Sequence, residues 1–235
     1  LLTAVHGLIG VKEVKHLWKV QKGDLAVLAI TFVATLTLGI EEGILTGVGA
    51  SLLWFVVRST RPHYAIIGKM PDSTEYRNVE RFPEVETTPG VLGIRIDQEF
   101  YFGNVTFLKD TLREEADKMD EPLRAVVIDA TSINQLDSSA DSALHQIADD
   151  YKSRDIELYF AGAKGPVRDV MQKSELWEKL GDDHFPLSVH EAMQAAAEYA
   201  RQHEDSGGGE GGPETPKGED GQVEVDPSSF PTHPA

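Results

Sequence analysis

Asp137 and Ser138 are the side chains whose types and position best suit a functional site. They close a short polar loop, residues 134–139 (NQLDSS), which follows the apolar run RAVVIDA and precedes a helix-like stretch. An aspartate in this place accepts hydrogen bonds from the free N–H groups of a helix start. A hydroxyl beside it would lie near the positive end of the helix dipole, which favours negative charge. We therefore take Asp137 and Ser138 as regulatory candidates, with simple helix capping as the alternative.

Two further carboxylates, Glu41 and Glu42, interrupt the most apolar stretch of the chain. Ionisable groups inside a membrane often accept protons or ions, because an unpaired charge there is costly. The pair has two interpretations. It is either an acceptor of protons or sodium ions, or a solvated turn at the membrane surface.

Other reactive chemistry has few residues to carry it. The chain has no cysteine, which excludes disulfides, thiolate nucleophiles and cysteine-ligated zinc. Its 8 histidines show no HxH or HxxxH spacing, so we predict no metal site. No GxSxG motif or catalytic triad order is present, and we interpret residues 162–165 as a strand-to-helix turn rather than an anion site. We therefore predict no catalytic residues, no cofactor and no enzyme activity.

The formal net charge of −17 makes nucleic acid an unfavourable partner, because acidic surfaces repel phosphate backbones and no basic patch offsets them. The charge is unevenly distributed: residues 1–60 contain five Lys and Arg against four Asp and Glu. The first quarter of the chain is therefore a different kind of segment from the rest. It also opens at Leu1 within an apolar run and without an initiator Met, so we interpret its start as a truncation.

Residues 25–57 are almost continuously apolar, which predicts membrane helices. One long tilted span would bury Glu41 and Glu42 at mid-bilayer, whereas a hairpin with arms at 25–40 and 43–57 would place them at a surface. We expect the hairpin, within a segment 24–58. Residues 1–23 would be the end of a membrane segment and an amphipathic interfacial helix with Trp18 at headgroup level. Lysines before the hairpin and arginines after it predict that both ends face the cytoplasm.

The remaining chain alternates strand and helix patterns after an extended linker over residues 59–89. Strands are predicted at 91–96, 99–102, 124–130 and 156–161, and helices at 105–119, 138–153, 165–173 and 189–203. This order predicts an α/β domain over residues 90–203, with a mixed sheet packed against helices. Residues 204–235 are rich in Gly, Glu, Pro and Ser and are predicted to be a disordered acidic tail.

The order of these motifs resembles the C-terminal part of SulP transporters, a family of inorganic anion transporters whose cytoplasmic end is a STAS domain. DLAVLAITFVATLTLGIEEGILTGVGASLL resembles the last membrane hairpin of the family, and AVVIDATSINQLDSSADSALHQI resembles the STAS signature. The resemblance extends over about residues 7–200, in the same order. It implies a membrane α-helical hairpin of the gate domain, followed by a STAS domain and the tail.

The resemblance also implies a function. The chain would be the gate-helix and STAS portion of a secondary active transporter for sulfate, bicarbonate or chloride, with roles in regulation, dimerisation and folding. The anion site would lie upstream of Leu1, so this chain alone should not transport. Membrane lipid, the rest of the membrane domain and a second copy of the chain are the expected partners. The alternative is a soluble signalling module similar to anti-sigma-factor antagonists, in which the serine matching Ser138 is phosphorylated. The choice of anion and the coupling mode stay open.

Overall fold

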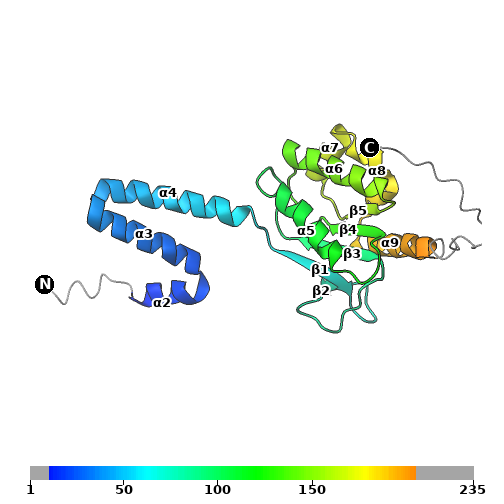
Figure 1. Cartoon of the computed structure of the whole chain (residues 1–235), viewed down its shortest axis with the longest axis horizontal. Helices are drawn as coiled ribbons and strands as arrows, with labels where there is room; N and C mark the ends of the chain where they lie inside the picture. The colour runs from blue at the N-terminus through cyan, green and yellow to red at the C-terminus, as the bar shows by residue number, and fades with distance from the viewer. Residues whose placement is uncertain (1–10, 205–235) are drawn as a thin grey trace, which may run out of the picture.

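A computed structural model describes residues 11–204, which form a helical arm followed by an α/β domain (Figure 1). The helices of the arm are α2 (Val11–Val20), α3 (Lys22–Leu38) and α4 (Ile40–Ser59). The strands of the domain are β1 (Tyr64–Lys69), β2 (Tyr76–Asn78), β3 (Val91–Ile96), β4 (Ala125–Asp129) and β5 (Glu157–Ala161). Its helices are α5 (Val105–Asp117), α6 (Ser138–Ser153), α7 (Gly165–Lys173), α8 (Leu176–Leu180) and α9 (Val189–Glu204), with a short 3₁₀ turn at Asp182–His184.

The predicted hairpin is present as the antiparallel pair α3 and α4. The chain reverses at Gly39, whose φ of 110° lies in a region that favours glycine. The turn is therefore at Gly39 rather than at the acidic pair. Glu41 and Glu42 are exposed in the first turn of α4, where carboxylates complement the helix dipole.

Glycine allows the two arms to approach closely. A Cβ atom at Gly43 would lie 2.3 Å from Thr35 Oγ1, and one at Gly47 would lie 2.6 Å from Thr31 Oγ1. Most of the large apolar side chains of the arms point outward, and Phe32, Leu36 and Phe55 are each about two-thirds exposed. Among residues 11–204, α4 is the one helix long and apolar enough to cross a membrane, judged by length and composition.

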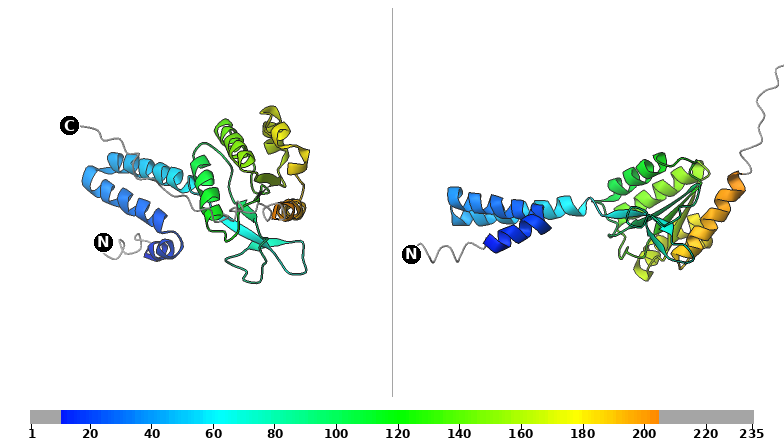
Figure 2. Two further views of the ribbon diagram at one scale, coloured as in Figure 1. Left: turned by 45° about the vertical axis from the view of Figure 1, so that its right-hand side comes forward. Right: turned by 90° about the horizontal axis from the view of Figure 1, so that it is seen from below.

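Five strands form one mixed sheet in the order β2-β1-β3-β4-β5. Strands β3, β4 and β5 are parallel, whereas β1 is antiparallel to both of its neighbours. Alternate side chains of the parallel strands face two cores. The larger core lies between the sheet and helices α5 to α8, and the smaller one lies under α9 on the opposite face (Figure 2). This is the mixed sheet packed against helices that the sequence predicted.

Several details differ from the sequence-based prediction. The segment 59–89, predicted as an extended linker, contains β1 and β2, which form one side of the sheet. Residues 99–102 form no regular strand: they make one isolated bridge, between Phe100 and Leu136, because Asn104 folds this segment into a turn. Helix α8 was not predicted. The predicted tail lies outside the described residues, as do the first ten residues of the segment assigned to a membrane end and interfacial helix.

Candidate functional site

Asp137 occupies the N-cap position of α6 and binds two different amide groups. Its Oδ1 accepts a hydrogen bond of 2.8 Å from the Ala140 N–H, inside the first turn of the helix. Its Oδ2 accepts a second bond of 2.8 Å from the Phe102 N–H, in the loop that follows β3. The predicted cap is therefore present, and the same carboxylate also holds a segment 35 residues earlier in the chain.

The β3–α5 loop, residues 97–104, is fixed to the α6 loop by its main chain as well. Phe100 N–H donates to the Gln135 carbonyl at 3.3 Å, and Asp137 N–H donates to the Phe100 carbonyl at 3.2 Å. Within the β3–α5 loop, Asn104 Oδ1 accepts from Tyr101 N–H, and its amide donates to the Glu99 carbonyl at 2.7 Å. The loop is thus a compact turn held by hydrogen bonds, both within itself and to the α6 loop.

The same loop contacts the end of the helical arm. The Tyr101 hydroxyl is hydrogen bonded to Ser59 Oγ, and Gln98 Nε2 donates to the Ser59 carbonyl at 3.3 Å. Ser59 is the last residue of α4. A continuous set of contacts therefore runs from α4, through Tyr101 and Phe102, to Asp137 at the start of α6. We call it the α4–α6 junction, made by Ser59, the β3–α5 loop and Asp137.

Ser138 lies next to this junction with an exposed side chain. Its carbonyl accepts from the Ser142 hydroxyl at 2.9 Å, while its own hydroxyl makes no hydrogen bond within residues 11–204. The hydroxyl is therefore accessible to an enzyme. It lies between Asp137 and the buried Asp141, whose Oδ1 accepts from Ser174 at 2.7 Å, so added negative charge here would meet two carboxylates.

The other sequence candidates give simpler structures. Gly162 has a φ of +66° and donates its N–H to the Pro186 carbonyl, which makes residues 162–165 a strand-to-helix turn. Within the described part of the chain, no three His, Asp or Glu side chains gather into a possible metal site.

Sequence reasoning missed Ser59, Gln98 and Tyr101. Each belongs to a different sequence context from Asp137, and no spacing pattern joins them. The Ser59–Tyr101 contact spans 42 residues and the Asp137–Phe102 contact spans 35. The first contact depends on the pairing of β1 with β3, and the second depends on the pairing of β3 with β4.

Ion pairs elsewhere in the domain lower the pKa values of two carboxyl groups. At the start of β5, Glu157 Oε2 lies 2.5 Å from His184 Nε2, and this hydrogen bond holds the pKa of Glu157 below its ordinary value. Next to the arm, burial alone would raise the pKa of Asp97, but hydrogen bonds from Arg95 and His63 outweigh it and lower that pKa. Both groups are negatively charged at neutral pH.

Comparison with known proteins identifies the domain and its relatives. Residues 82–192 match the STAS domain family. The chain is 35% identical over 210 residues to "Sulfate transporter 4.1, chloroplastic" of Arabidopsis thaliana. This match covers 86% of this chain and 31% of the relative. It is 34% identical over 214 residues to "Probable sulfate transporter 4.2" of the same plant, covering 87% of this chain and 32% of the relative.

The chain belongs to the SulP family. It spans about a third of the length of these curated relatives and includes the STAS domain of that family. The fold agrees. A solved structure titled "The overall structure of SLC26A9" superposes with a TM-score of 0.71 at 17% identity, covering 82% of this chain and 33% of that one. The structure of the murine Slc26a9 anion transporter in the inward-facing state superposes with a TM-score of 0.68 at 18% identity. This match covers 77% of this chain and 30% of that one. This SulP chain is thus a membrane protein segment with a STAS domain, related to transporters rather than to enzymes.

Proposed function

We propose that this SulP chain is the gate-helix and STAS portion of a secondary active transporter of inorganic anions, with sulfate as the first candidate. The names of the relatives carry this proposal, since the two described above are called sulfate transporters. Bicarbonate and chloride are the alternatives. The anion site itself would lie in membrane helices that are not part of this chain.

The helical arm supports a membrane location for the first part of the chain. Phe32, Leu36 and Phe55 would expose large apolar side chains to water if the protein were soluble. Hydrocarbon and the remaining helices of the transporter would cover them. This observation argues against the alternative of a soluble anti-sigma-factor-antagonist type module, which has no use for such a surface.

The topology supports a cytoplasmic STAS domain. Lys15 and Lys19 precede the hairpin, Lys22 begins it and Arg58 lies in its last turn. Positive charge at both ends supports a cytoplasmic location for both. Digestion of sealed inside-out vesicles by protease should remove the STAS domain, whereas right-side-out cells should protect it. Protection in the vesicles would contradict the orientation.

The α4–α6 junction supports a regulatory role for the STAS domain. A phosphate on Ser138 would add up to about two negative charges beside Asp137 and Asp141. Repulsion would weaken the Asp137 bond to Phe102 and so loosen the loop that holds Ser59. The same domain is proposed to support folding and to form a homodimer, which chemical crosslinking of the full transporter would detect.

Transport by reconstituted protein tests the proposal. The full-length protein in liposomes should take up labelled sulfate, bicarbonate or chloride, while the 235-residue chain alone should give only background uptake. Uptake by the chain alone would place the anion site in these residues and overturn the assignment. Full-length Ser138→Glu should change the transport rate, while Ser138→Ala should match the unmodified protein. Equal rates for all three would remove the regulatory role but not the transport function.

A further inference from the structure

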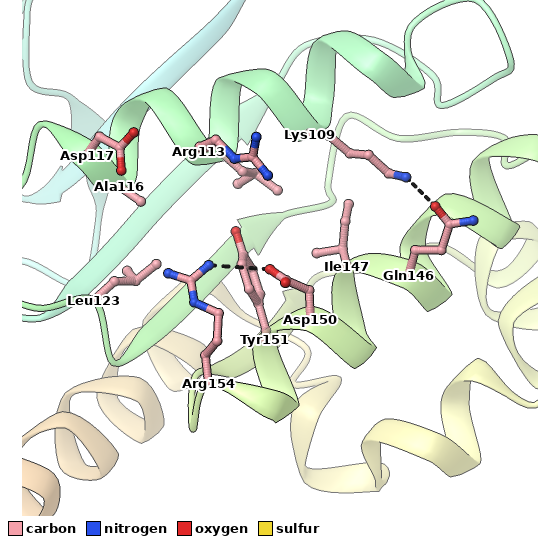
Figure 3. A pocket seen from close by; sticks show the side chains of 11 residues that line it. Lys109, Arg113, Ala116, Asp117, Leu123, Gln146, Ile147, Asp150, Tyr151 and Arg154 are labelled. Atoms are coloured by element: carbon pink, nitrogen blue, oxygen red, sulfur yellow. Dashed lines mark hydrogen bonds and ion pairs between the residues drawn. The ribbon is translucent and has the colours of Figure 1, made fainter. Parts of the chain in front are cut away.

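A cleft of about 420 Å³ opens between the C-terminal halves of α5 and α6 (Figure 3). Its lining combines apolar side chains with three cations and two carboxylates, Asp117 and Asp150, so the cations are in excess by one. The apolar part comes from Leu112, Ala116, Leu123 and Ile147, and the cations are Lys109, Arg113 and Arg154. Figure 3 shows the Tyr151 hydroxyl pointing from α6 toward α5 between the two arginines. Burial raises the pKa of Tyr151 to about 12, so the hydroxyl stays protonated and able to donate.

The cations of this cleft are incompletely neutralised. Arg113 makes no hydrogen bond or ion pair with any residue in the described range, and Lys109 donates to the uncharged Gln146 at 2.5 Å. Arg154 reaches Asp150 through one nitrogen at 3.3 Å, which leaves its other N–H groups free for a second acceptor. In a chain with a formal charge of −17, a cleft of this kind would attract an acidic segment with apolar side chains.

The last helix, α9, covers the opposite face of the sheet, but its last turns contact the segment that follows Arg154. In the last turns of α9, Tyr199 donates its hydroxyl to the Asp155 carbonyl at 3.3 Å. Asp155 directly follows Arg154, which lines the cleft. Helix α9 therefore reaches the end of the domain at which Arg154 lies.

We propose that residues 219–226 (EDGQVEVD) of the same chain bind in the cleft between α5 and α6. Their carboxylates would pair with Arg113 and Arg154, and Val223 and Val225 would contact the apolar lining. The 15 residues from Glu204 to Glu219 reach up to about 50 Å when extended, which is ample. A tether of this length gives an effective concentration of about a millimolar, so a weak contact is enough for occupancy.

Disulfide formation in the full chain tests this contact, since the chain has no cysteine of its own. The Ala116→Cys/Val223→Cys pair, with one cysteine in the cleft, should crosslink about tenfold faster than an Ala195→Cys/Val223→Cys control on the exposed side of α9. Adding Arg113→Glu and Arg154→Glu should remove this advantage, and so should about 1 M salt, which screens charges beyond roughly 3 Å. Both arginines are exposed, and hydrogen exchange of β4 would verify that the variants fold.

A charge exchange makes the test specific. Glu219→Lys and Asp220→Lys, combined with Arg113→Glu and Arg154→Glu, should restore fast crosslinking. Equal rates for Ala116→Cys and Ala195→Cys would overturn the proposal, and so would an advantage that survives reversal of both arginines. Removal of residues 205–235 should also speed up hydrogen exchange in α5 and α6. An unchanged rate would contradict the proposal, because it would show that this segment does not cover the cleft.

Discussion

Asp137 links two parts of the domain through one carboxylate. A cap needs a single acceptor, and Oδ1 already serves Ala140. Oδ2 serves Phe102 instead, so loss of the side chain removes the cap and releases the loop at once. Helix capping and the junction therefore depend on the same group.

Replacement of Asp137 should show both roles. Asp137→Ala is expected to lower the free energy of unfolding of the STAS domain by about 1–2 kcal/mol, because a lost cap and a lost amide acceptor both contribute. Hydrogen exchange of the whole chain should show faster exchange at the Phe102 and Ala140 amides. Ser139→Ala, an exposed neighbour, should stay within about 0.5 kcal/mol. Unchanged exchange at Phe102 in Asp137→Ala would disprove the link.

The Glu157–His184 pair predicts an acid-dependent loss of stability. Since the pKa of Glu157 is lower in the folded chain than its ordinary value of 4.5, the pair stabilises the fold above that value. The contribution disappears as the pH falls through the lower, folded-state pKa. Thermal unfolding measured from about pH 7 to about pH 3 should therefore show a larger loss for the unmodified chain than for Glu157→Gln. Two parallel curves would show that the hydrogen bond to His184 contributes nothing.

At the scale of elements, the close approach of α3 and α4 depends on which face of α4 each glycine occupies. Gly43 and Gly47 face Thr35 and Thr31 at distances that leave no room for a Cβ atom, whereas a Cβ at Gly49 would meet nothing within 4 Å. Residues of one type, on one helix, are therefore predicted to differ in their tolerance of alanine.

Gly43→Ala and Gly47→Ala should separate the arms and destabilise the hairpin by about 1–3 kcal/mol, the usual cost of overpacking. Gly49→Ala is the matched control and should be neutral or stabilise α4 by up to about 1 kcal/mol, because alanine favours helix. Spin-label distances between the ends of the arms, measured in nanodiscs, would detect the separation. Equal distances in all three variants would contradict the packing.

The elements that the sequence predicted well have strong local patterns. Helix α6 follows a capping aspartate with apolar residues at helical spacing, and β4 is a short, wholly buried apolar run. Strand β1 has only a short apolar stretch and β2 has only three residues, and their flanks are rich in proline and charge. The sequence analysis predicted the reversal at the acidic pair rather than at Gly39. Charged residues can be recognised in a sequence, whereas the positive φ of Gly39 is known only from the structure. For the candidate site, spacing predicted the Asp137 cap but not the contacts of Phe102 and Tyr101, which depend on the folded sheet.

At the scale of the whole molecule, the chain combines an apolar arm with an acidic α/β domain (Figure 1). The arm needs an apolar environment, whereas the domain keeps its apolar side chains in two cores. The two parts are thus suited to different solvents.

Cell fractionation should show that the arm favours lipid and the α/β domain favours water. The whole chain is expected in the membrane pellet, where it should resist alkaline extraction, because the exposed apolar side chains of α3 and α4 favour lipid. Residues 62–204 expressed alone should appear in the supernatant. Recovery of the whole chain as a soluble monomer would contradict a membrane hairpin and would revive the soluble-module alternative.

Only four residues separate Ser59, at the end of α4, from Tyr64, at the start of β1. So short a segment spans at most roughly 18 Å even when extended. Hydrogen bonds from Tyr101 and Gln98 to Ser59 restrict its movement further. The sheet therefore has almost no freedom to swing on its own. We expect a rotation or displacement of α4 to carry the α/β domain with it, because the short segment and the contacts of Ser59 join the two.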